Sequence, residues 1–293
     1  MKKLLITGAS GFLGWNLCSV ASNRYSVIAV SNNNPIELDN ISKRKCDITD
    51  YHQLKNLFIS EKPDAVIHAA AASNPNFCQN NPEESFKINV SASINIAGLC
   101  ADLQAACIFT SSDLVFNGKN PPYKEDDLTA PLNIYGQQKV SAEQQMRSRY
   151  ENVTICRMPL MYGDAPDSAG SFIKLWIQKL IDGNTLNLFT DEVRTPVSAL
   201  DASRGLLIAL EKPGEIIHLG GQERLSRFDI GRILYDLIGN PKSVIKPCKQ
   251  KDVPMAAPRP TDVSLDSSKA IAMGYNPGTI EEEVRKLKCL SGR

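Results

Sequence analysis

Short runs of apolar, mostly β-branched residues alternate with longer amphipathic stretches in the first half of the chain. The apolar runs predict strands at 3–7, 27–31, 65–68, 106–110 and 153–157. The stretches between them predict helices near 12–22, 51–60, 82–102 and 133–150. Each crossover is long enough to reach the next parallel strand, which a hairpin would not require. The pattern therefore predicts an α/β fold with a doubly wound parallel sheet.

The pattern becomes irregular after about Gly163. Helices are predicted at 171–181, 200–210 and 227–239, and extended segments at 186–189 and 215–219. The segment 246–260 is too rich in proline for either regular element, and Thr279 opens a capping box that predicts a helix near the end. We predict a dinucleotide-binding domain at 1–163, to which 196–222 returns. A smaller C-terminal substrate-binding lobe would consist of 164–195 and 223–293.

Composition and charge narrow the classes of partner. The 293 residues include 33 basic and 32 acidic ones, so a net charge of +1 gives no field to attract nucleic acid or anionic lipid. No apolar run approaches the ~20 residues of a membrane span. Thr7-Gly8 interrupts the apolar start, which is too short for a signal peptide, so we expect a cytoplasmic protein. The 8 cysteines form no CxxC pair, and we expect no metal site.

A glycine-rich turn follows the first predicted strand and opens the first predicted helix. Gly8, Gly11 and Gly14 have GxxGxxG spacing rather than GxGxxG. Such glycines allow a tight turn, a close approach of phosphate to the backbone, and close packing of the helix. A pyrophosphate could then bind to backbone N–H groups at the helix N-terminus. A plain glycine turn is the alternative, but the strand-turn-helix setting favours a dinucleotide site of the Rossmann type.

The second predicted strand lacks the carboxylate that usually holds the ribose diol of NAD at its end. Ser31, Asn32 and Asn33 stand there instead, so no negative charge would repel a 2′-phosphate. NADP is therefore the favoured cofactor and NAD the alternative, although no arginine stands beside these residues. The asparagine run is also typical of a simple turn.

Tyr135 and Lys139 stand four residues apart in a predicted helix, so both lie on one face. A cation at this spacing is expected to lower the pKa of the phenol, which could then exchange a proton with a ketone or alcohol oxygen. Ser112 follows a predicted strand at the carboxyl edge of the sheet, where its hydroxyl could bond the same oxygen. Each feature alone also has an ordinary structural explanation, and only their combination indicates catalysis.

The sequence resembles the extended short-chain dehydrogenase/reductase family over essentially its full length. The resemblance rests on TGASGFLG at 7–14, CDI at 46–48, HAAA at 68–71, the Ser-Ser-Asp strand end at 111–113 and YGQQK at 135–139. Segments 113–118, 122–125, 131–135, 259–260 and 264–269 are similar, more narrowly, to the dTDP-4-dehydrorhamnose reductase branch. The resemblance implies an NAD(P)-dependent oxidoreductase that reduces a 4-keto nucleotide-linked deoxysugar. Hydride would come from nicotinamide C4 and a proton from Tyr135.

The resemblance also implies which residues form the site. Catalysis would use Ser112, Tyr135 and Lys139. Cofactor binding would use Gly8, Ser10, Gly11, Phe12, Leu13, Gly14, Ser31, Asn32, Asn33, Asp47, Ile48, Ala69, Ala70, Ala71, Tyr135 and Lys139. Substrate binding would use Ser112, Asp113 and Arg194. Arg194 could pair with a nucleotide diphosphate, and a solvated surface arginine is the equal alternative.

Two other functions fit the same resemblance. One is an NAD-dependent sugar-nucleotide 4-epimerase, and the other is a noncatalytic NADP-binding regulatory subunit like the β subunit of methionine adenosyltransferase. Leu114 stands where related dehydratases carry an acidic residue, which disfavours a dehydratase. His68, where the branch often has asparagine, is expected to be structural. The sequence identifies neither the sugar nor the base, and it leaves the oligomeric state open, with a homodimer as one option.

Overall fold

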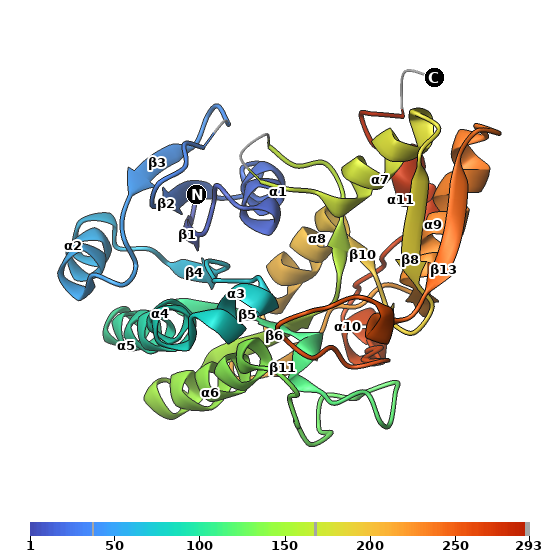
Figure 1. The fold of residues 1–293 in the computed structure, drawn as a ribbon. Coiled ribbons are helices and arrows are strands. Elements are labelled where there is room, and N and C mark those ends of the chain that lie inside the picture. The colour runs from blue at the N-terminus through green and yellow to red at the C-terminus, as the bar shows by residue number, and fades with distance from the viewer. Residues whose placement is uncertain (37, 167–168, 291–293) are drawn as a thin grey trace.

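A parallel sheet of seven strands forms the centre of the computed structural model, which describes residues 1–36, 38–166 and 169–290 (Figure 1). The strand order is β11-β6-β5-β4-β1-β2-β3, and the order reverses beside β1. This is the doubly wound topology that the sequence predicted. The strands are β1 (Lys3–Thr7), β2 (Ser26–Ser31), β3 (Ser42–Lys45), β4 (Ala65–His68), β5 (Ala106–Ser112), β6 (Val153–Met158) and β11 (Ile216–His218).

Helices cover both faces of this sheet because its inner strands are apolar on both sides. In β1, Leu4 and Ile6 face the cluster that includes α1 and α8, whereas Leu5 faces the cluster of α2, α5 and α6. This alternation follows from the two-residue period of a strand. The helices are α1 (Phe12–Ala21), α2 (Tyr51–Glu61), α3 (Pro75–Asn80), α4 (Pro82–Phe86), α5 (Ala92–Leu103), α6 (Ile134–Arg149) and α8 (Ala199–Ala209).

Two elements of the main sheet region differ from the prediction. The strand β3 was not predicted, because its sequence SKRK has no apolar position and all four residues are exposed. An outermost strand can be polar, since charged residues on an edge discourage pairing with another chain. The single helix predicted over 82–102 is divided into α4, a π-helical turn (Lys87–Ser91) and α5.

A smaller group of elements packs around a separate apolar cluster (Figure 1). It includes α7 (Phe172–Ile181), α9 (Arg227–Ile238), α11 (Ile280–Arg285) and the parallel pair β8 (Thr185–Phe189) and β13 (Val244–Cys248). The strand β13 covers 246–248 and a 3-10 turn covers Gln250–Asp252, so the expectation that 246–260 lacks regular structure is wrong for its first part, whereas 253–260 has neither helix nor strand. Pro247 is tolerated there because β13 pairs with β8 alone. Thr279 caps α11 in the predicted capping box.

Short elements connect these two groups. They are β7 (Met161–Tyr162), β9 (Val193–Arg194), β10 (Val197–Ser198), β12 (Leu225–Ser226) and α10 (Ser268–Ala272). Strand β10 pairs with β7, and β12 pairs with β9. In the described ranges of the chain, no helix is long and apolar enough to cross a membrane.

Candidate functional site

A cleft of about 710 Å³ lies at the carboxyl edge of the sheet, where the strand order reverses. Ligands of doubly wound folds bind at this position. Every residue that the sequence predicted for cofactor binding lines the cleft. The structure therefore brings together segments from residue 8 to residue 139, and their role in binding remains a prediction.

The sequence missed several other residues of the cleft wall. They are Val30, Asn34, Cys46, Thr49, Ser73, Glu84, Lys87, Ile88, Thr110, Ser111, Met158 and Met161. Val30, Asn34, Cys46 and Thr49 adjoin predicted cleft residues, so a wider window at those strand ends would have included them. The group at 84–88 carries no such signal, because it comes from the α4 region.

The glycines form a cradle that side chains would fill. Gly8 has φ +70°, and a Cβ there would lie 2.7 Å from the Cα of Ala70. A Cβ on Gly14 would lie 2.2 Å from the carbonyl oxygen of Gly8. Gly11 precedes α1 and offers no capping side chain, so the first N–H groups of α1 lack intrahelical acceptors. The cradle therefore fits a diphosphate, which helix N-termini attract.

A positively charged side chain, Lys45 of β3, lies beside the end of β2. Lys45 of β3 pairs in register with Ser31 of β2, which lines the cleft. Arg44 points to the opposite face of the sheet, where it forms an ion pair with Glu61 of α2 at 2.6 Å. Because side chains alternate along a strand, Lys45 lies on the same face as Ser31.

The helix α6 carries the tyrosine and lysine into the cleft. The Asn133 side chain accepts a hydrogen bond from the Gly136 N–H at 2.9 Å and so begins the helix. Tyr135 and Lys139 both line the cleft and are buried. The Lys139 ammonium donates to the carbonyl oxygen of Thr110 at 2.8 Å, and its nitrogen lies 5.8 Å from the centre of the Tyr135 ring.

The acidity of Tyr135 differs from the expectation. Burial raises its pKa above the ordinary value, the charge of Asp113 raises it further, and a hydrogen bond with Ser112 opposes both. Burial also lowers the pKa of Lys139 to about 8, against the attraction of Glu143. The expectation that Lys139 lowers the pKa of the phenol is therefore wrong for this structure, because loss of hydration disfavours the phenolate. The arrangement keeps Tyr135 protonated, as an acid must be.

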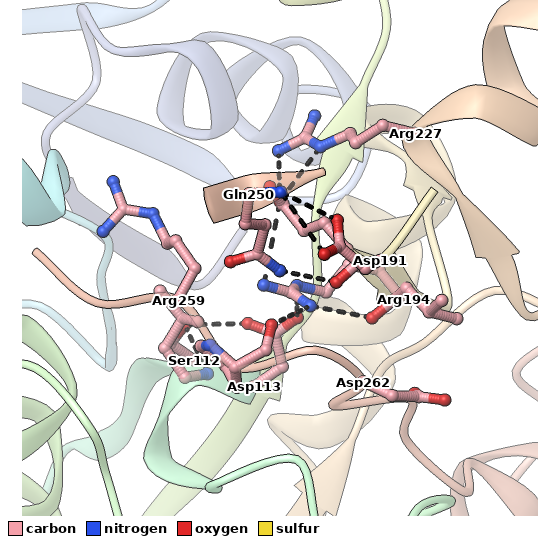
Figure 2. A network of polar contacts seen from close by, with 12 residues as sticks. Ser112, Asp113, Asp191, Arg194, Arg227, Gln250, Arg259 and Asp262 are labelled. Carbon is pink, nitrogen blue, oxygen red and sulfur yellow. Dashed lines mark hydrogen bonds and ion pairs between the residues drawn. The ribbon is translucent and has the colours of Figure 1, made fainter. Parts of the chain in front are cut away.

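The three residues predicted to bind substrate lie outside the lining of the cleft and are buried. The Ser112 hydroxyl donates to Oδ1 of Asp113 at 3.1 Å, and Nε of Arg194 lies 3.3 Å from Oδ2 of Asp113 (Figure 2). Nη2 of Arg194 lies 3.7 Å from Oε1 of Glu192. The interpretation of Arg194 as a solvated surface arginine is wrong, because its side chain is buried, and its pairing with a nucleotide diphosphate stays a prediction. No motif signalled Glu192, which stands only two residues before it.

His68 and Asn89 are buried next to the cleft residues Ala69 and Ile88 but do not line the cleft themselves. The His68 ring bonds the Thr7 hydroxyl at 2.7 Å and the Ser93 hydroxyl at 3.0 Å. Burial, followed by the charge of Lys139, lowers the pKa of His68 to about 3, so the ring stays neutral. Asn89 is buried and donates to the Gln138 side chain at 2.9 Å. Both residues have structural contacts, as expected for His68.

The sequence and the fold are similar to those of known proteins. The family model described as RmlD substrate binding domain matches residues 1–288. The chain is 31% identical over 287 residues to methionine adenosyltransferase 2 subunit beta of Xenopus laevis, covering 95% of this chain and 84% of that protein. It is 28% identical over 285 residues to dTDP-4-dehydrorhamnose reductase of Mycolicibacterium smegmatis, covering 94% and 81%. A crystal structure of a hypothetical dTDP-4-dehydrorhamnose reductase from Sulfolobus tokodaii superposes with a TM-score of 0.82 and 32% identity, covering 93% and 94%.

Proposed function

Since the chain belongs to the RmlD substrate binding domain family, within the extended short-chain dehydrogenases/reductases, we propose that it is an NAD(P)H-dependent reductase of a 4-keto nucleotide-linked deoxysugar. One observation carries this proposal: the glycine cradle and the Tyr135–Lys139 pair line the same cleft. A dinucleotide and a proton donor are the two components that carbonyl reduction requires. We also propose that residues 1–163 and 196–222 form the dinucleotide-binding domain, and that 164–195 and 223–293 form the substrate-binding lobe.

NADP is the cofactor that we favour, with NAD as the alternative. The cradle of Gly8, Gly11 and Gly14 suits the diphosphate because the first N–H groups of α1 have no intrahelical acceptor and Gly11 brings no capping side chain. Ser31 brings no negative charge, and Lys45 beside it brings a positive one that suits a 2′-phosphate. When bound, the reduced nicotinamide supplies the hydride from C4.

The side chains of the cleft would then manage the proton and the developing charge. Tyr135, kept protonated by burial, gives its proton to the substrate oxygen. Lys139, fixed by the Thr110 carbonyl, supplies positive charge beneath that oxygen. Ser112 and Asp113 at the end of β5 stay the predicted contacts on the sugar side.

A substrate panel tests the reductase. Purified protein is mixed with NADPH or NADH and a series of 4-keto nucleotide sugars, and loss of nicotinamide absorbance is followed. Tyr135→Phe should lower turnover by about 10²- to 10⁴-fold while leaving cofactor affinity nearly unchanged. Tyr235→Phe on α9, whose residue does not line the cleft, is the matched control. Full turnover by Tyr135→Phe would contradict the proposal, and interconversion of 4-epimers without net loss of reduced cofactor would indicate the epimerase.

A regulatory subunit is the second candidate, favoured by the likeness to methionine adenosyltransferase 2 subunit beta. In that case the cleft would bind NADP without turning over a ketone. Size-exclusion chromatography with a purified methionine adenosyltransferase catalytic subunit separates the two candidates. Stable co-elution without turnover of any ketone in the panel favours the subunit, whereas turnover without co-elution favours the reductase.

A further inference from the structure

A buried chain of charged side chains runs from Ser112 of the main sheet to α9 of the smaller group of elements (Figure 2). Asp113 follows the end of β5, Arg194 ends β9, and Arg227 begins α9. Glu192 joins the two arginines, since its Oε1 lies 3.7 Å from Arg194 and 3.0 Å from Arg227. The side chains of Asp113, Arg194 and Glu192 are at most 8% exposed, so these charges depend on one another.

The hydroxyl of Ser112 is oriented by this chain. An ionised carboxylate can only accept hydrogen bonds, so the contact of 3.1 Å with Oδ1 of Asp113 directs the proton of Ser112 toward Asp113. The Ser112 hydroxyl oxygen in turn accepts a hydrogen bond from the Leu114 N–H at 3.1 Å. The charge of Asp113 also raises the pKa of Tyr135 and so favours its protonated form. The charge state of Asp113 therefore affects both the direction of the Ser112 proton and the protonation of Tyr135.

Arg194 determines whether Asp113 can stay ionised inside the protein. Burial alone would favour the neutral acid, and it raises the pKa of Asp113 to about 6. The charge of Arg194 is the largest opposing influence, Arg227 acts in the same direction from α9, and Glu192 acts against them. Arg194 is itself fixed, since its Nη1 donates to the carbonyl oxygen of Val193 at 2.7 Å.

We propose that Arg194 is a positioning residue: by holding Asp113 as a carboxylate, it orients the Ser112 hydroxyl and keeps the Tyr135 proton in place for donation to the substrate oxygen. The proposal rests on the proposed reductase and adds to it a residue of β9 that need not touch the substrate. It explains why a guanidinium with two carboxylate partners lies buried beside the cleft.

The test uses two substitutions that should have opposite effects on the ionisation of Asp113. Arg194→Gln removes the cation that favours the Asp113 carboxylate, so the acid limb of kcat/KM should move to higher pH. Glu192→Gln removes an anion that disfavours the carboxylate, so the same limb should move to lower pH. A displacement of one pH unit would change kcat/KM about tenfold on the acidic side of the limb. Arg194→Lys keeps the charge and should restore the limb toward its original position.

A merely structural role would not move the limb in opposite directions. An unchanged limb in both variants, or displacement in the same direction, overturns the proposal. If Arg194→Gln does not fold, Glu192→Gln decides the test, because it leaves the Asp113–Arg194 ion pair intact. If the wild-type protein reduces no ketone in the panel, the titration of the Asp113 carboxyl carbon, followed by NMR, replaces kcat/KM. The same opposite displacements there would support the positioning role although the reductase proposal had failed.

Discussion

Alanine substitutions in the glycine cradle should rank differently by their effect on the free energy of unfolding and by their effect on cofactor affinity. Gly8→Ala combines two costs: ~1–2 kcal/mol for a side chain in the left-handed region and about 1–3 kcal/mol for overpacking against Ala70. Gly14→Ala would place its Cβ 2.2 Å from the Gly8 carbonyl oxygen, a closer backbone contact, so the ~1 kcal/mol gained in helix propensity does not offset its cost. Gly11→Ala has an ordinary φ and meets one atom at 3.2 Å, which should cost about 1 kcal/mol or less.

Cofactor binding should rank these variants differently. A methyl group on Gly11 would lie 3.2 Å from the Gly8 carbonyl oxygen at the turn where α1 begins and would narrow the space for a diphosphate, so we expect at least about tenfold weaker binding, or ~1.4 kcal/mol. Urea unfolding of the cofactor-free protein measures stability, and calorimetric titration with NADPH measures affinity. Gly239→Ala is the matched control, since Gly239 has φ +67° and no atom within 4 Å of the added Cβ.

Three results would refute this reasoning. If Gly8→Ala lowers the free energy of unfolding no more than Gly239→Ala does, then the close approach of Ala70 does not restrict the side chain at position 8. If Gly11→Ala binds NADPH as tightly as the wild-type protein, then the cradle is a structural turn and not a diphosphate site. Loss of folding in Gly11→Ala comparable to that in Gly8→Ala would also contradict the prediction.

Three further predictions concern single side chains. Lys45→Gln should weaken NADPH binding about tenfold and leave NADH binding unchanged, because it removes a charged hydrogen bond to the 2′-phosphate. Arg44→Gln on the opposite face of the sheet is the control and should change neither dissociation constant. Tyr275→Phe should keep the free energy of unfolding in urea within about 1 kcal/mol or raise it, because its buried hydroxyl has no hydrogen-bond partner among the described residues; a loss of ~2 kcal/mol would contradict this. Turnover should fall as the pH rises through about 8, where Lys139 loses its proton. This basic limb of the pH–rate profile should be absent in Lys139→Arg, because arginine keeps its charge. An identical basic limb in that variant would assign the limb to another group.

The sequence determined those features whose cause is local. Strand β1 spans the predicted residues, because four of its five side chains are buried and apolar runs of that length favour an inner parallel strand. The glycine turn and the spacing of Tyr135 and Lys139 were also readable, since turn chemistry and helical periodicity act over a few residues. These features were sufficient to predict the doubly wound fold and part of the lining of the cleft.

Only the tertiary structure decided the electrostatics of the site. Sheet pairing places Lys45 beside Ser31 although fourteen positions separate them, and β9 brings Arg194 against Asp113 from far along the chain. Burial then raises the pKa of Tyr135 where helical spacing alone suggested that it would fall. The physical reason is that periodicity depends on neighbours along the chain, whereas the energy of a charge depends on its loss of water and on the charges that folding brings near it.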